Sequence, residues 1–142
     1  MSQRNGSSRL VGGSLLIVAM AASVHVARWV AMLRGRGLKI AILTSVDTGV
    51  APELSPCRII RSRQELDSLP AGEVAIFDVK SVDAAEAAEA DAAAGYAWPG
   101  HPAHPAGLPT SPHVVRACIA SLRPDIVHSM EVQFAGYIVL EA

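Results

Sequence analysis

Two apolar runs with one amphipathic stretch between them limit the folds open to this chain more than any other feature of its sequence. The run Leu15–Met20 does not alternate apolar with polar residues, which is typical of a strand covered on both faces. A second strand-like run spans Leu38–Thr44. Between the two, apolar side chains recur at helical spacing at Val26, Trp29, Val30 and Leu33. This order of strand, helix and strand predicts a βαβ unit with a right-handed crossover.

The predicted helix carries suitable residues at both of its ends. Ser23 is a candidate N-cap, because its hydroxyl can accept a hydrogen bond from a free backbone N–H of the first turn. Gly37 stands where a left-handed residue commonly ends a helix. We therefore expect the helix to span Val24–Arg36.

The rest of the chain continues the alternation of strands and helices. A loop is expected over Asp47–Pro56. Residues 81–112 are expected to be the least regular block: its first, alanine-rich and acidic part could form a helix, and its second part, from Trp98 onward, is proline-rich and irregular. Strands are expected at Cys57–Arg61, Glu73–Val79 and Asp125–His128, and helices from Pro112 to Arg123 and over Glu131–Ala142. These elements predict one α/β domain with a parallel sheet over residues 14–142, following a disordered start at residues 1–13. Because the last helix has no capping residue, we expect the sequence to be truncated.

Composition excludes some classes of function. A net charge of −1 and scattered arginines leave no basic surface for nucleic acid. Cys57 and Cys118 are far apart, lack metal-type spacing and lie in apolar segments, so we expect two buried, free thiols in a reducing, cytoplasmic compartment. Residues 1–21 also have the outline of a signal peptide, and secretion remains an open alternative.

Two segments contain candidate site residues at predicted carboxyl ends of strands, where ligands bind in open α/β sheets. Ser23, His25 and Arg28 follow the first strand, and the start of the helix there offers free N–H groups to an anion. His128, Ser129 and Glu131 follow the last strand, and a histidine there can hydrogen-bond a sugar hydroxyl or carry a proton.

The remaining candidates are weaker. His101 and His104 are three residues apart, but no Cys, Asp or Glu nearby completes a metal shell. His113 has no evident partner, and Asp78 ends a predicted strand that could face the same crevice. The chain contains no glycine-rich phosphate loop.

Together, the two crevice segments resemble glycosyltransferase family 4. The pattern Ser23-x-His25-x-x-Arg28-Trp29 follows the first strand, and Arg123-Pro-Asp-Ile-Val-His-Ser-Met-Glu131 leads into Gln133–Tyr137. The resemblance is to the N-terminal, acceptor-side domain of these retaining, GT-B-type enzymes, and it covers about half of the chain. Family members often have a Gly-Gly pair after the first strand, where this chain has Ala21-Ala22.

The resemblance implies a Rossmann-like parallel sheet with flanking helices, forming the N-terminal half of a GT-B fold. It implies transfer of a sugar from a nucleotide-diphosphate donor to a glycan or lipid-linked acceptor, without a cofactor or metal. It also implies peripheral contact with a membrane. His128 and Glu131 would be catalytic, and substrate would be bound by Ser23, His25, Arg28 and Ser129. The donor-binding domain is not in this chain, which we expect to be inactive alone.

A second interpretation is a small, non-catalytic binding module of the flavodoxin-like type, for which the chain length is suitable. A response regulator, by contrast, needs an acidic cluster after its first strand, and this chain has Ala21-Ala22-Ser23 there.

Overall fold

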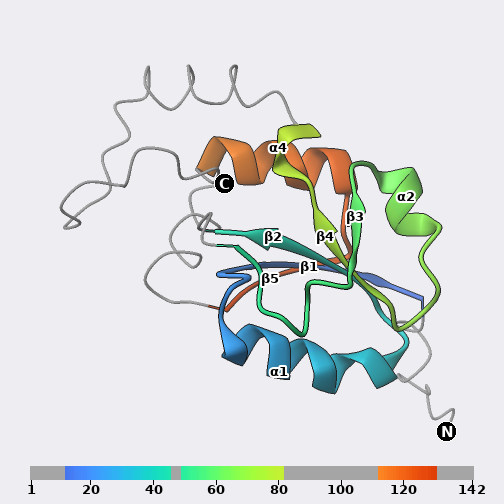
Figure 1. Cartoon of the computed structure of the whole chain (residues 1–142). Coiled ribbons are helices and arrows are strands. Elements are labelled where there is room, and N and C mark those ends of the chain that lie inside the picture. The colour runs from blue at the N-terminus through green and yellow to red at the C-terminus, as the bar shows by residue number, and fades with distance from the viewer. Residues whose placement is uncertain (1–11, 46–48, 82–111, 131–142) are drawn as a thin grey trace, which may run out of the picture.

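Figure 1 shows the computed structural model of the chain, which describes residues 12–45, 49–81 and 112–130. All five strands of the described sheet are parallel: β1 (Ser14–Ala19), β2 (Lys39–Thr44), β3 (Arg58–Ile60), β4 (Val74–Phe77) and β5 (Ile126–Ser129). The flanking helices are α1 (Val24–Leu33), α2 (Arg63–Asp67) and α4 (Pro112–Leu122), with 3₁₀ turns at Arg34–Arg36 and Val79–Ser81. The predicted α/β, Rossmann-like architecture is confirmed.

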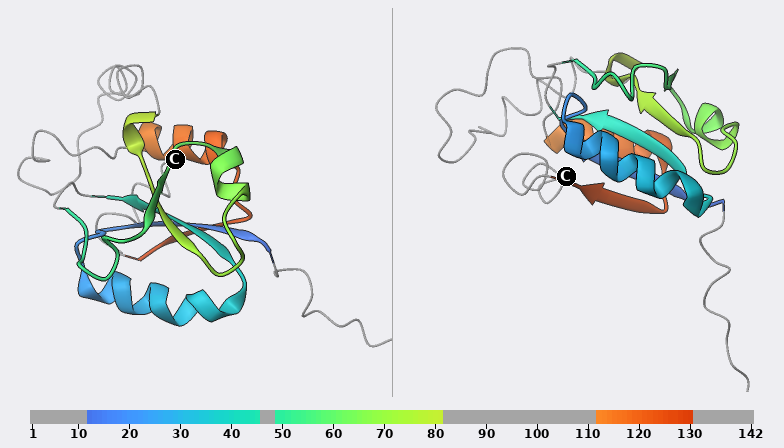
Figure 2. Two further views of the ribbon diagram at one scale, coloured as in Figure 1. Left: turned by 45° about the vertical axis from the view of Figure 1, so that its right-hand side comes forward. Right: turned by 60° about the horizontal axis from the view of Figure 1, so that its bottom comes forward.

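Helices cover both faces of the sheet. In Figures 1 and 2, α1 lies on one face, and α2 and α4 lie on the other. Leu16 and Ile17 are adjacent in β1 and so point to opposite faces, yet neither has any exposed surface. Leu16 packs in the core beneath α4, and Ile17 in the core beneath α1. The absence of alternation in the first apolar run follows from this double cover.

The strand order is β3-β4-β2-β1-β5. From β1 the chain passes through α1 to the adjacent β2, and then to β3 at the far edge of the sheet. It returns through α2 to β4, and β5 lies on the opposite side of β1. A right-handed crossover that runs in the reverse direction puts its helix on the other face. This rule accounts for α1 on one face and α2 and α4 on the other.

The ends of α1 agree with the prediction. The Ser23 hydroxyl accepts from the backbone N–H of His25 at 3.2 Å, and Gly37 is left-handed with φ of 73°. Between them, the α-helix ends at Leu33 and tightens into the 3₁₀ turn before Gly37. The helical stretch therefore has the predicted bounds, with a last turn of different geometry.

Helix α2 was not predicted from the sequence. Its signal is Ser62-x-x-Glu65, a capping box. The Ser62 hydroxyl accepts from the Glu65 backbone N–H at 3.2 Å, and the Glu65 carboxylate accepts from the backbone N–H of Arg61. The helix has only five residues, too few for an apolar stripe to reveal it.

The two predicted thiols differ in burial. Cys118 is fully buried beneath the sheet, and its pKa is raised by that burial to about 12. Cys57 is half-buried, and both cysteines are free. No helix within the described ranges is long and apolar enough to cross a membrane.

Candidate functional site

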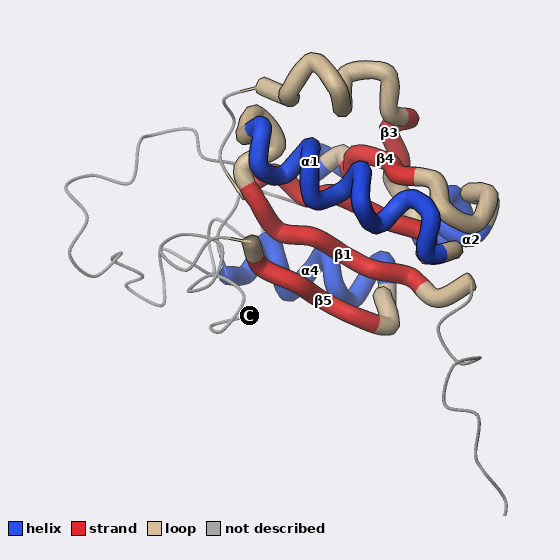
Figure 3. The backbone as a smooth tube through the Cα atoms, turned by 90° about the horizontal axis from the view of Figure 1, so that it is seen from below, coloured by secondary structure: helices blue, strands red, loops and turns tan. Residues whose placement is uncertain are grey.

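The carboxyl ends of β1 and β5 define the candidate site. These strands are parallel neighbours, with Val18 opposite Ser129, while β2 occupies the other side of β1. The chain leaves β1 through α1 toward β2, whereas β5, which is entered through α4, lies on the other side of β1, so the strand order reverses between β1 and β5. Ligands of open α/β sheets bind in the crevice at such a point. Figure 3 shows β1 and β5 side by side, with α1 in front of the sheet on the other side of β1.

The turn after β1 is held by its own backbone. The Ser23 N–H donates to the carbonyl of Met20 at 2.9 Å, while the Ser23 carbonyl accepts from the Ala27 N–H at 3.2 Å. His25 and Arg28 follow in the first two turns of α1, and both side chains are exposed. The predicted residues of this segment thus lie together at the carboxyl edge of the sheet, with imidazole and guanidinium groups open to a ligand.

The loop after β2 is hydrogen-bonded to the end of β1 and to the turn that follows it. The Ala51 N–H donates to the Ala21 carbonyl at 2.8 Å, and the Ser45 N–H donates to the Ala19 carbonyl at 2.9 Å. Ala51 and Leu54 are buried against the core beneath α1. Ser45 is 1% exposed, and its hydroxyl has no hydrogen-bond partner within the described part of the chain.

On the side of β1 opposite to β2, β5 contributes His128 and Ser129. His128 is opposite Ile17, whose side chain faces α1, so the imidazole lies on the α1 face of the sheet. Ser129 is opposite Val18, which faces α4, and its side chain therefore lies on the other face. Only one of these two predicted residues thus shares a face with α1.

A stacked pair of rings joins the two predicted segments. The ring centroids of Trp29 and His128 are 4.6 Å apart, and their planes are inclined by 15°. Trp29 was predicted as part of the apolar stripe of its helix and as the last residue of the first pattern that resembles family 4, but no contact with a site residue was predicted for it. One sequence signal could have suggested more, because Trp29 follows His25 by four residues and so shares its helical face.

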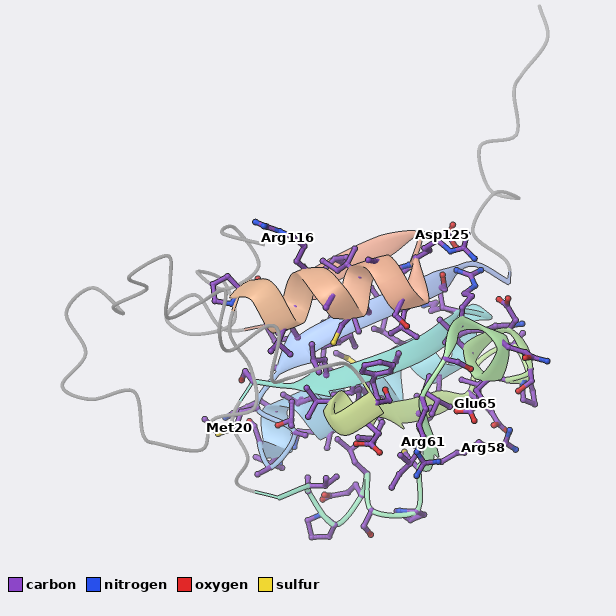
Figure 4. The ribbon with its side chains drawn as sticks, turned by 90° about the horizontal axis from the view of Figure 1, so that it is seen from above. Met20, Arg58, Arg61, Glu65, Arg116 and Asp125 are labelled. Atoms are coloured by element: carbon purple, nitrogen blue, oxygen red, sulfur yellow. The ribbon has the colours of Figure 1, made fainter. Side chains whose placement is uncertain are left out.

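Asp125 belongs to the stretch that resembles family 4, but it lies at the other end of β5. Figure 4 shows Asp125 at the end of the sheet opposite to Met20, which follows β1. Its carboxylate accepts from the backbone N–H of Ser14 at 2.8 Å and from the Ser14 hydroxyl at 3.0 Å. These hydrogen bonds lower the pKa of Asp125. The residue fastens β5 to β1 and is not part of the crevice.

Asp78 follows β4 at the carboxyl edge of the sheet, but β2 separates β4 from β1, so Asp78 does not lie between β1 and β5. Its carboxylate is 3.3 Å from the guanidinium Nε of Arg61, beside β3. Glu131, His101 and His104 lie outside the described residues, as does the side chain of His113. The described residues contain no cluster of three or more His, Cys, Asp or Glu side chains suited to a metal.

A surface cavity of about 370 Å³ lies at the opposite, amino end of the strands. Arg58 and Val74, which begin β3 and β4, line it together with Arg34, Glu53, Pro56, Cys57, Gly72 and Glu73. The guanidinium of Arg34 donates to the Cys57 sulfur at 3.7 Å, while burial raises the pKa of that thiol. The topology rule favours the carboxyl edge over this cavity as the functional site.

Comparisons of the chain with protein-family models, with curated proteins and with solved structures found no match.

Proposed function

We propose that this chain is the acceptor-side domain of a retaining, GT-B-type glycosyltransferase. One observation supports the proposal most: the two segments that resemble family 4 are far apart in the sequence but adjacent at one switch point of the sheet. Their contact through Trp29 and His128 joins the first helix to the last described strand. The resemblance in sequence and the expected place for a ligand therefore coincide.

The chemistry of sugar transfer suits the groups at this edge. The bond from the sugar to the diphosphate breaks as the bond to the acceptor oxygen forms, and the proton of the acceptor hydroxyl passes to the departing diphosphate. Positive charge therefore develops on the sugar and negative charge on the diphosphate in the transition state. Hydrogen bonds and fixed positive charge stabilise such a transition state. His128 would contact the sugar or the acceptor, and Ser23, His25 and Arg28 would line the path of the diphosphate. Glu131 and Ser129 complete the proposed set.

The proposal requires a second domain to hold the nucleotide-diphosphate sugar. The acceptor would be a glycan or a lipid-linked saccharide, as in polysaccharide biosynthesis, with the reaction on the cytoplasmic side of a membrane. No cofactor or metal is part of the proposed reaction.

The test measures turnover by the complete gene product that contains this chain. Purified protein is incubated with UDP-glucose or GDP-mannose, with and without glycan acceptors, and release of nucleoside diphosphate is followed. We expect release by the wild type and a loss of about 10²–10³-fold in His128→Ala, the usual cost of removing one hydrogen-bond donor that is directed at the transition state. A gene product that turns over neither donor under any of these conditions would count against a glycosyltransferase using them.

The flavodoxin-like alternative is less consistent with the sheet. The flavodoxin order is 2-1-3-4-5, in which the second strand forms an edge. Here β2 lies between β1 and β4 and is an interior strand. Stoichiometric uptake of flavin mononucleotide by the purified chain would reverse this preference.

A further inference from the structure

The contacts of His128 differ from those of a histidine held by hydrogen bonds. Within the described residues, the imidazole stacks on Trp29 and makes no hydrogen bond. A histidine in a reactive site is commonly oriented by a hydrogen bond to one ring nitrogen, which leaves only the other nitrogen for a ligand. Stacking acts on the face of the ring and occupies neither nitrogen.

The position of β5 makes such support necessary. Within the described sheet β5 has one neighbour, β1, and the side chain of His128 is exposed. An exposed side chain on an edge strand can exchange between several rotamers unless a neighbouring group restricts it. Trp29 comes from a helix that packs on the same face and is itself partly buried against the core, so it provides a fixed surface.

We propose that Trp29 is a positioning residue that sets the plane of the His128 imidazole and leaves both ring nitrogens for substrate. The inference rests on the proposed function for the identity of that substrate. The orientation of the ring is a property of the chain itself and can be measured without turnover.

The first experiment observes the ring by nuclear magnetic resonance. The imidazole proton signals of His128, assigned by their loss in His128→Gln, should be shifted upfield by the indole and should show nuclear Overhauser contacts to it. Trp29→Phe should keep a reduced upfield shift, and Trp29→Leu should abolish it. His25 is the control, because no ring within the described residues stacks on it. Unshifted His128 signals in the folded wild type would overturn the stacked arrangement.

The second experiment asks whether the orientation matters for turnover of UDP-glucose or GDP-mannose by the complete gene product. We expect Trp29→Leu to lower kcat at least tenfold with little change in KM, and Trp29→Phe to restore most of it. In the His128→Gln background, Trp29→Leu should cause no further loss, because a residue that acts only through His128 has nothing left to orient. Circular dichroism of each variant establishes that it is folded.

The outcomes separate this inference from the proposed function. An equal loss from Trp29→Leu in both backgrounds means that Trp29 acts on the fold alone and overturns the positioning role. Absence of turnover in the wild type contradicts the proposed function, while the magnetic resonance experiment still decides whether Trp29 fixes the ring.

Discussion

Gly72, in the turn before β4, is a position where one methyl group should be costly. Its φ is +87°, and its N–H donates to the Leu38 carbonyl at 2.9 Å. A Cβ at this position would lie 2.5 Å from the carbonyl oxygen of Arg34. That oxygen belongs to the backbone at the end of α1, so relief requires movement of the backbone.

The cost of Gly72→Ala has two unfavourable parts. A left-handed conformation costs a non-glycine residue about 1–2 kcal/mol, partly offset by about 0.4–1 kcal/mol from the reduced entropy of the unfolded chain. Overpacking against an unyielding neighbour adds about 1–3 kcal/mol. Gly49→Ala isolates the first part, because Gly49 has φ of +90° and a Cβ there would have no described neighbour within 4 Å. Gly72→Ala should therefore lose about 1–3 kcal/mol more than Gly49→Ala.

Urea denaturation followed by circular dichroism measures the difference between the two free energies of unfolding. Gly35→Ala is a second control, because Gly35 has neither a positive φ nor a close neighbour among the described residues. Equal destabilisation by Gly72→Ala and Gly49→Ala would refute the contact with Arg34 and the close approach of α1 to the turn before β4.

Three further predictions concern the fold. Arg123, which follows α4 with φ of 45°, should be replaceable by glycine with a gain of up to about 1 kcal/mol in unfolding free energy, and a loss would contradict its left-handed geometry. The Asp125 pKa is lowered by Ser14, so its contribution to stability is complete above the unfolded pKa and disappears as pH falls through the folded one. Urea midpoints measured from about pH 5 down to pH 2 should therefore fall more steeply in the wild type than in Asp125→Asn, and equal slopes would refute the assignment. Ser45→Ala removes a buried hydroxyl without a partner in the described chain and should raise the thermal midpoint or leave it unchanged, whereas a clear decrease would reveal a partner.

Local sequence signals were sufficient to predict most of the described helices and strands. The run Leu15–Met20 predicts a strand covered on both faces because its side chains are apolar on both sides. Ser23 and Gly37 indicate the helix ends, because the Ser23 hydroxyl caps the first turn and Gly37 adopts a left-handed conformation. The capping box that starts α2 is also a local signal, but a helix of five residues is too short for an apolar periodicity to support it. Short elements of this kind are therefore the hardest to predict.

The order of the strands depends on contacts that local patterns do not encode. Nothing near β4 in the sequence indicates that it lies between β2 and β3, since the pairing of Ile42 with Ile76 joins distant parts of the chain. For the same reason the stacking of Trp29 on His128 was not predicted, although each residue was identified in its own segment. Asp125 was predicted only as the start of the last strand, and its hydrogen bonds to Ser14 at the amino end of β1 also depend on a pairing of distant segments.

The central claim is that function resides at the carboxyl edge of β1 and β5 and not at the cavity beside Arg58. The most direct test measures release of nucleoside diphosphate from UDP-glucose or GDP-mannose by variants of the complete gene product. Two variants, Arg28→Gln and His128→Ala, change the crevice, and two others, Glu53→Gln and Arg58→Gln, change the cavity. We predict that both crevice variants lose at least about tenfold in kcat/KM, equivalent to about 1.4 kcal/mol, and that both cavity variants stay within about twofold of the wild type. Loss of activity in the cavity variants, with crevice variants at the wild-type rate, would contradict the account.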